Sequence, residues 1–199
     1  MARKVFFSFH YDDVISFRAN VVRNHGFFKG NMVAGFWDNS IWEDTKRTGE
    51  LALKRLINRA LDGTSVTCVL IGSETYKRPW VRYEIFKSIE RGNGILGIHI
   101  NGIKDKDQFT KPQGANPFQY LSIQSSQTIL MSSHLEPQEW DGDRGRWISF
   151  GKLPEMDYFG PRVFNGQLHS YFDVYDWIID DGYNSFGEWV ERAAREAGR

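Results

Sequence analysis

Cysteine is scarce in this sequence, and neither sign of charge dominates. Cys68 is the single cysteine among 199 residues, which excludes an intrachain disulfide and a cysteine cluster for structural zinc. The five histidines are scattered along the chain, so no metal site is expected. The 25 basic and 25 acidic side chains cancel. This balance argues against a nucleic-acid-binding module, because such modules rely on clustered Lys and Arg.

Long apolar runs are also missing. No run reaches the roughly 18 residues that a membrane-spanning helix needs. The first residues, Met-Ala-Arg-Lys-Val, enter a strand-like run at once, without the apolar stretch and cleavage site that mark a signal peptide. The sequence therefore predicts a cytoplasmic protein without a membrane partner.

Aromatic residues, by contrast, are plentiful. They make up 15% of the chain, with 7 Trp and 15 Phe, and hydrophobic residues make up 41%. The length and composition suit one globular domain, or one domain with a sizeable appendage. The aromatic surplus fits an aromatic-rich core or a stacking surface for a planar ligand, and both interpretations stay open at this stage.

The first 100 residues alternate between strand and helix patterns. Short apolar, β-branched and aromatic runs predict strands at residues 4–9, 32–37, 65–71 and 95–100. Such strands, separated by helices, are typical of right-handed βαβ crossovers. The pattern predicts an α/β fold with a doubly wound parallel sheet.

Helical patterns fill the gaps between these strands. Three helices are expected, and they begin at Asp12 or Asp13, at Thr48 and at Pro79. The first has one apolar face, which consists of Val14, Phe17, Val21 and Val22. The third is expected to end near Arg91, before Gly92.

The pattern changes after residue 101. Residues 101–116 are polar and predict a loop. Strand-like pieces follow at residues 128–131 and in a hairpin over residues 139–148, and Ser185 with Glu188 predicts the capping box of a terminal helix. We expect residues 1–100 to form the core of the protein and residues 101–199 to form a C-terminal α+β extension packed on that core.

Ligands of open parallel sheets bind at the carboxyl ends of the strands, near the point where the strand order reverses. The residues expected there are Ser8, Phe9 and His10 after the first strand, Asp38 after the second, and Ser73 and Tyr76 after the third. Trp80 and Glu84 follow on one face of the next helix. Aromatic faces with few carboxylates suit a ligand with a planar ring and hydroxyls. On spacing alone, a solvated Glu84 and a core Trp80 remain alternatives.

Two short segments resemble the TIR family. Residues 5–10 (Val-Phe-Phe-Ser-Phe-His) resemble the opening strand of TIR domains, and residues 80–84 resemble the Trp-x-x-x-Glu helix of the NAD-cleaving members. Residues 1–100, together with residues 174–177 and 180–184, more closely resemble the TIR-like proteins of the bacterial Thoeris anti-phage systems. The resemblance implies a flavodoxin-like, TIR-like fold.

The resemblance also implies an activity. Members of the family cleave the nicotinamide–ribose bond of NAD, which is their substrate and not a cofactor. Thoeris members release a cyclic ADP-ribose isomer as a second messenger, which activates a separate effector protein. The family enzymes often self-associate, so a homo-oligomer is implied as well.

Site residues are carried over from the family by motif. The resemblance implies that Glu84 is the catalytic glutamate of an NAD glycohydrolase or ADP-ribosyl cyclase and that Trp80 is a pocket aromatic. It also matches the rim of the nucleotide pocket to Ser8, Phe9 and His10. The assignments of Asp38, Ser73 and Tyr76 to substrate binding rest on position alone, without a matched motif.

Two other functions fit the same residues. A TIR module can act without catalysis, by assembling with partners, since a fold does not determine a function. A nucleoside deoxyribosyltransferase-like enzyme also uses a glutamate near an anomeric carbon on a similar sheet. Turnover of NAD would favour the leading hypothesis, and turnover of free nucleosides without NAD cleavage would favour the last.

Overall fold

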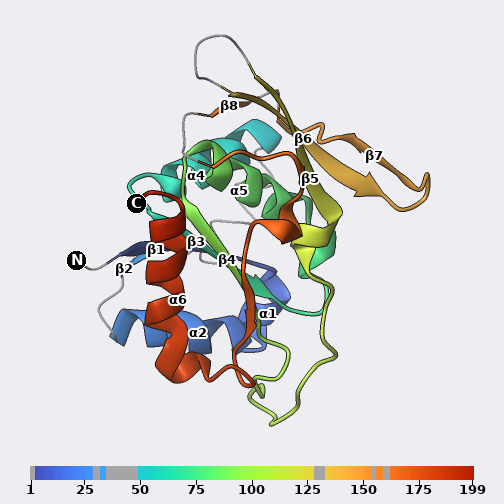
Figure 1. Cartoon of the computed structure of the whole chain (residues 1–199). Coiled ribbons are helices and arrows are strands. Elements are labelled where there is room, and N and C mark those ends of the chain that lie inside the picture. Colours follow the sequence, from blue (N-terminus) through green and yellow to red (C-terminus); the bar gives the residue numbers. More distant parts are fainter. Residues whose placement is uncertain (1–2, 29–31, 35–48, 128–132, 154–155, 159–161) are drawn as a thin grey trace.

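The structure is a computed structural model that describes residues 3–28, 32–34, 49–127, 133–153, 156–158 and 162–199. Within these ranges the chain forms a five-stranded parallel sheet between layers of helices and a five-stranded antiparallel sheet beside it (Figure 1). The parallel sheet positions the candidate site. The antiparallel sheet packs against one of the helices that flank the parallel sheet.

The parallel sheet has the strand order of a flavodoxin-like fold. Its strands are β1 (Lys4–Phe9), β2 (Met32–Ala34), β3 (Val66–Ile71), β4 (Gly94–His99) and β10 (Val174–Asp176). They lie in the order β2-β1-β3-β4-β10, and every pairing is parallel. With β10 as the fifth strand this is the 2-1-3-4-5 order, whose switch point lies between β1 and β3. The predicted α/β fold is confirmed.

Sequence pattern explains why β3 occupies the middle of this sheet. Its six residues, Val-Thr-Cys-Val-Leu-Ile, are all buried, as expected for a strand that is covered on both faces. Cys68 has no exposed surface, and this burial raises the pKa of its thiol well above the ordinary value. The predicted burial of Cys68 in the middle of a strand is confirmed.

Helices cover both faces of the parallel sheet (Figure 1). The helices α4 (Glu50–Leu61) and α5 (Pro79–Glu90) pack on one face, and α2 (Arg18–Phe28) and α6 (Gly182–Glu196) pack on the other. Alternate residues of β1 point to opposite faces, so Phe6 joins the hydrophobic cluster of α4 and α5 whereas Phe7 joins that of α2 and α6.

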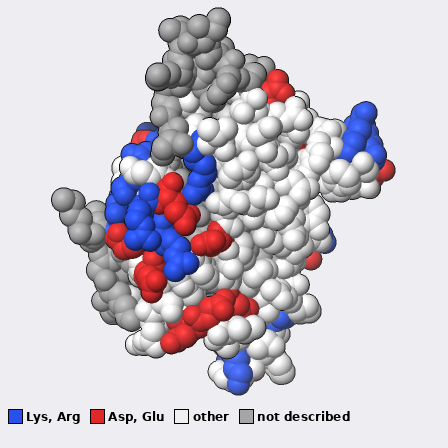
Figure 2. Space-filling view, viewed as in Figure 1, with Lys and Arg blue, Asp and Glu red and all other residues white. Residues whose placement is uncertain are grey.

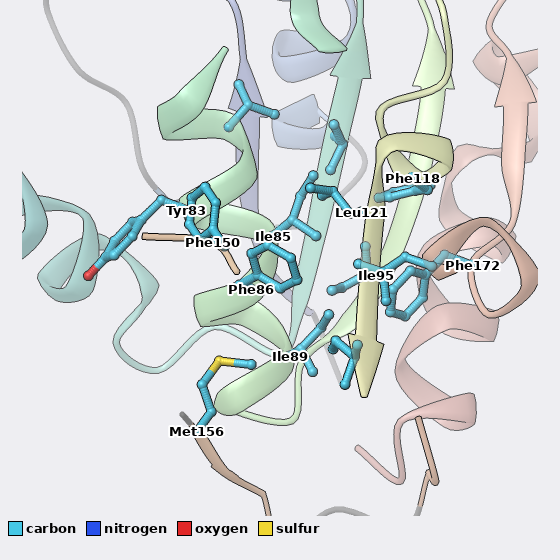
Figure 3. Packing of buried hydrophobic residues seen from close by; sticks show 14 of the residues in the cluster. Tyr83, Ile85, Phe86, Ile89, Ile95, Phe118, Leu121, Phe150, Met156 and Phe172 are labelled. Carbon is cyan, nitrogen blue, oxygen red and sulfur yellow. The ribbon is translucent and has the colours of Figure 1, made fainter. Parts of the chain in front are cut away.

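The chain beyond residue 101 shares the first of these clusters. Ile85, Phe86 and Ile89 extend from α5, with Phe150 beside Phe86 on one side and Phe118 on the other (Figure 3). The rings of Phe86 and Phe150 lie 5.1 Å apart. Residues on both sides of position 100 therefore form one core, and the division of the chain into a core of residues 1–100 and an extension of residues 101–199 stays a prediction.

The first predicted helix is split in the structure. It consists of α1 (Tyr11–Ile15) and α2, and Phe17 lies between them with a left-handed backbone conformation, φ = 65°. Phe17 and Val21 are exposed, so the expectation of a continuous apolar face was wrong. Asp12 and Asp13 lie in the first turn of α1, whose N-cap is His10. The helix begins earlier than predicted because β1 already ends at Phe9.

The C-terminal segment completes the parallel sheet. Strand β10 pairs with β4 as a fifth strand, which the sequence did not predict because only three residues are extended. Helix α6 begins at Gly182, after Asp181, so the capping box expected at Ser185 was wrong. The predicted apolar face of this helix is buried at Phe186, Trp189 and Val190.

Five strands from the described parts of residues 121–167 form the antiparallel sheet. Its strands are β5 (Leu121–Gln127), β6 (Ser133–Asp141), β7 (Arg146–Ser149), β8 (Met156–Tyr158) and β9 (Gly166–Gln167). The order is β7-β6-β5-β9, and β8 also pairs with β6. The pairing of β6 with β7 confirms the predicted hairpin, which projects from the molecule in Figure 1. Three expectations concern residues that the structure does not describe. They are the strand at 128–131, the cap at Thr48 and the end of the strand at 32–37.

Candidate active site

The switch point of the parallel sheet brings together two of the predicted site residues. Ser8 lies near the carboxyl end of β1, and Glu84 lies on α5. The Ser8 hydroxyl donates a hydrogen bond of 2.5 Å to Oε2 of Glu84. Ser8 is fully buried and Glu84 is 5% exposed, which decides against the alternative that Glu84 is an ordinary solvated carboxylate.

Burial controls the charge of this glutamate. Loss of solvent raises the pKa of Glu84 to about 8, and the hydrogen bond from Ser8 opposes that rise. A buried carboxyl group that holds a proton near neutral pH is uncommon outside functional sites. Among the described residues, no positively charged partner of Glu84 contributes to this shift.

The sequence of α5 explains why Glu84 faces the sheet. Pro79 occupies the first turn, where its missing N–H costs nothing. Val81, Ile85 and Ile89 form the buried stripe that fixes the helix on the sheet, as predicted. One turn beyond Glu84, Ser88 donates to the backbone oxygen of Glu84 and bonds to the side chain of Thr67 on β3.

Phe9 and His10 continue from Ser8 at the end of β1. Phe9 is partly buried, and the guanidinium of Arg23 lies 5.4 Å from its ring centre. His10 is also partly buried. Burial and the nearby charges of Arg78 and Lys111 lower the pKa of His10. His10 is therefore a neutral imidazole at pH 7, which can donate or accept a hydrogen bond at this edge.

Ser73 and Tyr76 lie in the loop that leads from β3 into α5. The loop begins with the backbone N–H of Gly72, which donates to Oγ1 of Thr75 at 2.9 Å. Tyr76 belongs to the short helix η1 (Thr75–Lys77), and its ring lies 5.2 Å from the ring of Tyr120. Ser73 and Tyr76 are both partly exposed, at the edge where the sequence placed them.

Trp80 lies on the surface of the first hydrophobic cluster. It is partly buried and makes an edge contact with Tyr83, with ring centres 5.6 Å apart. The ammonium of Lys152 lies 4.6 Å from the indole centre. Trp80 therefore has a packing role, and its expected role in substrate binding stays a prediction. Asp38, the remaining predicted site residue, lies outside the described residues.

Asp13 is a buried carboxylate at this edge that the sequence analysis treated only as a helix cap. It is 2% exposed, and its Oδ2 has no hydrogen-bond partner among the described residues. It packs so closely on Gly72 that a Cβ at position 72 would lie 2.1 Å from that oxygen. Burial raises the pKa of Asp13 to about 6. Local sequence pattern could not reveal the contact between Asp13 and Gly72, because these residues are 59 positions apart.

The surroundings of the site carry mixed charge. A cavity of about 390 Å³ opens beside this edge, and it is lined by Asp12, Ile15, Ser16, Asp105, Lys106, Asp107 and Lys111. Figure 2 shows acidic and basic groups intermixed on part of the visible face and a broad uncharged area on the rest. This visible face therefore has no extended basic surface of the kind that binds nucleic acid.

In the described part of the chain, no group of three or more His, Cys, Asp or Glu side chains could hold a metal ion. No helix in these ranges is long and apolar enough to cross a membrane.

Comparison with known proteins places this fold in a family. The model of the family described as "Thoeris protein ThsB, TIR-like domain" matches residues 6–105, which contain Ser8, Glu84, most of β1 and the whole of β2, β3 and β4. The chain is 53% identical over 196 residues to a protein of Bacillus cereus (strain MSX-D12) named "Putative cyclic ADP-D-ribose synthase ThsB1". The alignment covers 96% of this chain and 100% of that relative. The chain therefore belongs to the family of TIR-like Thoeris ThsB proteins.

Proposed function

We propose that this protein is an enzyme that cleaves NAD and releases a cyclic ADP-ribose isomer. The observation that carries the proposal is the buried Ser8–Glu84 hydrogen bond at the switch point of a flavodoxin-like sheet. The name of the 53% identical relative, a cyclic ADP-D-ribose synthase, supports NAD as the substrate. The family resemblance supports a role in anti-phage defence, in which the product is a second messenger for a separate effector protein.

The reaction makes one main demand on the site. Breaking the nicotinamide–ribose bond returns the bonding electron pair to the pyridinium ring, which leaves as neutral nicotinamide. No acid is required for this leaving group, but positive charge develops on the ribose, as in glycoside hydrolysis. A carboxylate beside the ribose stabilises that charge and orients the sugar.

Glu84 meets this demand once it is ionised. Its high pKa means that the free protein holds the carboxyl proton near neutral pH. Binding of the cationic pyridinium beside Glu84 favours the carboxylate and lowers this pKa. The Ser8 hydroxyl already donates to Oε2 of Glu84, so it holds the carboxylate in one orientation as the charge develops.

The fate of the ribose cation determines the product. Capture by water gives linear ADP-ribose, and capture by a hydroxyl of the same molecule gives a ring. A site that excludes water favours the ring. We propose Phe9, Tyr76 and Trp80 as the aromatic wall that excludes water, with Ser8, His10, Asp38 and Ser73 as further substrate-binding residues.

The decisive experiment compares wild-type protein with Glu84→Gln. We expect wild type to convert NAD to nicotinamide and a cyclic product, identified by mass and chromatography. The glutamine variant should keep the fold and lose turnover by on the order of 100-fold or more, the usual effect of removing one electrostatic stabiliser. Full activity of a folded Glu84→Gln variant would contradict the proposed role of Glu84.

Glu188→Gln serves as a matched control. Glu188 is an exposed glutamate on α6 that pairs with Arg192 at 3.3 Å, and its replacement should leave turnover unchanged. Wild-type protein that does not cleave NAD at all would favour the assembly module, and cleavage of free nucleosides alone would favour the deoxyribosyltransferase-like alternative.

We further propose that the enzyme acts in the cytoplasm, without a cofactor, and that it can form a homo-oligomer.

A further inference from the structure

Arg82 connects the antiparallel sheet to the candidate site. It lies on α5, between Trp80 and Glu84. Its Nε and Nη2 donate to the backbone oxygen of Tyr76 at 3.2 and 3.0 Å. Its Nη1 donates to Oε2 of Glu139, which lies on β6. One guanidinium therefore links β6 to the loop between β3 and α5.

This ion pair is better shielded from water than a typical surface pair. The Arg82 and Glu139 side chains are 16% and 21% exposed. The guanidinium uses three of its five N–H groups in this arrangement, so its plane is fixed by both partners. Partial burial and this geometry make the pair stronger than exposed pairs, which contribute little.

Two other contacts hold the same loop from the side of residues 101–120. The ring of Tyr120 packs on that of Tyr76. Gly114 lies so close to the loop that a Cβ at position 114 would be 2.0 Å from the carbonyl oxygen of Gly72. The loop that carries Ser73 and Tyr76 is thus fixed at its beginning and at its end by segments that lie beyond residue 101.

We propose that Glu139 is a positioning residue, which acts through Arg82 to hold Tyr76 in place and thereby favours the cyclic product over linear ADP-ribose. This inference rests on the proposed function. It assigns a purpose to the antiparallel sheet, since β6 then fixes the aromatic wall that keeps water from the ribose cation. A loosened Tyr76 admits water, and water competes with the intramolecular hydroxyl for the anomeric carbon. In either outcome the carbon–nitrogen bond breaks, nicotinamide takes the electron pair, and the attacking O–H loses its proton.

The test compares Glu139→Gln with Glu191→Gln in the full chain. Glu191 also pairs with an arginine, Arg3, through three hydrogen bonds of 3.0 to 3.1 Å, but this pair is more exposed and lies at the amino end of β1. We measure the melting temperature, the rate of NAD consumption and the ratio of cyclic to linear product for each variant. Both substitutions should lower the melting temperature by a few degrees or less. Only Glu139→Gln should lower the product ratio, by on the order of tenfold, because small displacements of positioning groups cost up to about 100-fold.

Arg82→Lys provides a second, independent variant. Lysine keeps the charge opposite Glu139 but lacks the planar fork that donates twice to the Tyr76 carbonyl. It should lower the product ratio in the same direction as Glu139→Gln, and it keeps the proposal testable if the glutamine variant does not fold.

The outcomes separate this inference from the proposed function. Unchanged product ratios in folded Glu139→Gln and Arg82→Lys, or an equal shift in Glu191→Gln, would overturn the positioning role while wild-type activity stands. Wild-type protein that consumes NAD without any cyclic product would overturn the positioning role together with cyclisation, and inactive wild-type protein would overturn the proposed function as a whole.

Discussion

At the scale of single residues, the site depends on a carboxyl group whose environment opposes its charge. Glu84 is buried and is held by Ser8, and this burial raises the pKa of Glu84 to about 8. The proposed chemistry needs the ionised form, so the free enzyme near neutral pH is mainly in the form that cannot stabilise a ribose cation. The same environment also gives the carboxylate a larger effect once it forms, because the local dielectric constant is low.

The pH dependence of the reaction follows from that pKa. We expect kcat/KM for NAD to rise as the pH is raised through about 8, where Glu84 ionises in the free enzyme. The rise in kcat should occur at lower pH, because bound pyridinium favours the carboxylate. Initial rates across a pH series give both kcat/KM and kcat. A kcat/KM that falls as the pH is raised through about 8 would contradict the proposed role of Glu84.

Ionisation of Glu84 should have the opposite effect on stability, because it favours the reaction but destabilises the folded protein. The folded protein holds the proton more tightly than the unfolded chain does, so its stability falls as the pH rises from 4.5 to about 8. Glu84→Gln removes this cost. We expect the variant to melt at a higher temperature than wild type above about pH 8, with the difference shrinking toward about pH 4. An equal difference at both ends would show that ionisation is not its cause.

Gly72 offers a test of the packing around Asp13. A Cβ at position 72 would lie 2.1 Å from Oδ2 of Asp13, and overpacking of this kind costs about 1–3 kcal/mol. Gly72→Ala should therefore unfold at lower denaturant concentration, and adding Asp13→Ala should recover part of the loss. Gly142→Ala is the control, because nothing lies within 4 Å of a Cβ there.

At the scale of elements, the break between α1 and α2 is the main departure from the expected pattern. Val14, Phe17, Val21 and Val22 have the spacing of one helical face, yet Phe17 adopts φ = 65°. The break lets Ala19 and Val22 pack under the sheet while Phe17 remains 54% exposed. Apolar spacing cannot show such a break, because the residues on both sides of it keep the helical pattern.

The left-handed backbone conformation at Phe17 predicts an unusual order of stability for two variants at this position. Asn tolerates the left-handed region, whereas a β-branched residue is a clear outlier there. We expect Phe17→Asn to be more stable than Phe17→Val by about 1 kcal/mol, although valine is the more hydrophobic residue. Urea unfolding of the two variants measures the difference, and a more stable valine variant would argue against a left-handed conformation at this position.

Local pattern was sufficient for the strands and helices that are long and continuous. Strands β1, β3 and β4 and helix α5 were predicted within about two residues, the usual margin for element ends, because each has a continuous or strongly periodic apolar pattern. β10 was missed because three residues carry too little pattern. Glu84 was assigned to the candidate site by family resemblance, because its spacing from Trp80 alone left a solvated glutamate as an alternative, whereas the contact of Arg82 with Glu139 was missed. Their contact spans 57 positions, and no local pattern encodes it.

At the scale of the whole molecule, the two ends of the chain are needed by one core. α6 buries Phe186, Trp189 and Val190 against strands from the first 100 residues, and β10 covers the edge of β4. The N- and C-termini lie on the same side of the molecule (Figure 1), where Arg3 pairs with Glu191 at 3.0 Å. The parallel sheet therefore receives its fifth strand, and one of the helices that cover it, from the C-terminal part of the chain.

Truncation tests this dependence. A fragment of residues 1–173 lacks β10 and α6, and a fragment of residues 101–199 lacks the strands and α5 on which it packs. We expect neither to show a cooperative thermal transition by circular dichroism, since each leaves a large apolar surface uncovered. As a control, substitution of the exposed Asp143 and Arg144 at the hairpin tip should leave the transition of the full chain unchanged. A cooperative monomer formed by either fragment would contradict the single core.

The late position of β10 and α6 also affects how the protein is made. Chains are synthesised from the N-terminus at roughly 5–20 residues per second, so Ser8, Glu84 and Glu139 all emerge from the ribosome before the final strand and helix. Until those last residues follow, one face of the parallel sheet lacks α6, one of the two helices that pack on it. An unfinished chain therefore lacks part of the packing beneath the candidate site, and we expect the proposed cleavage of NAD to begin only after β10 and α6 have joined the sheet.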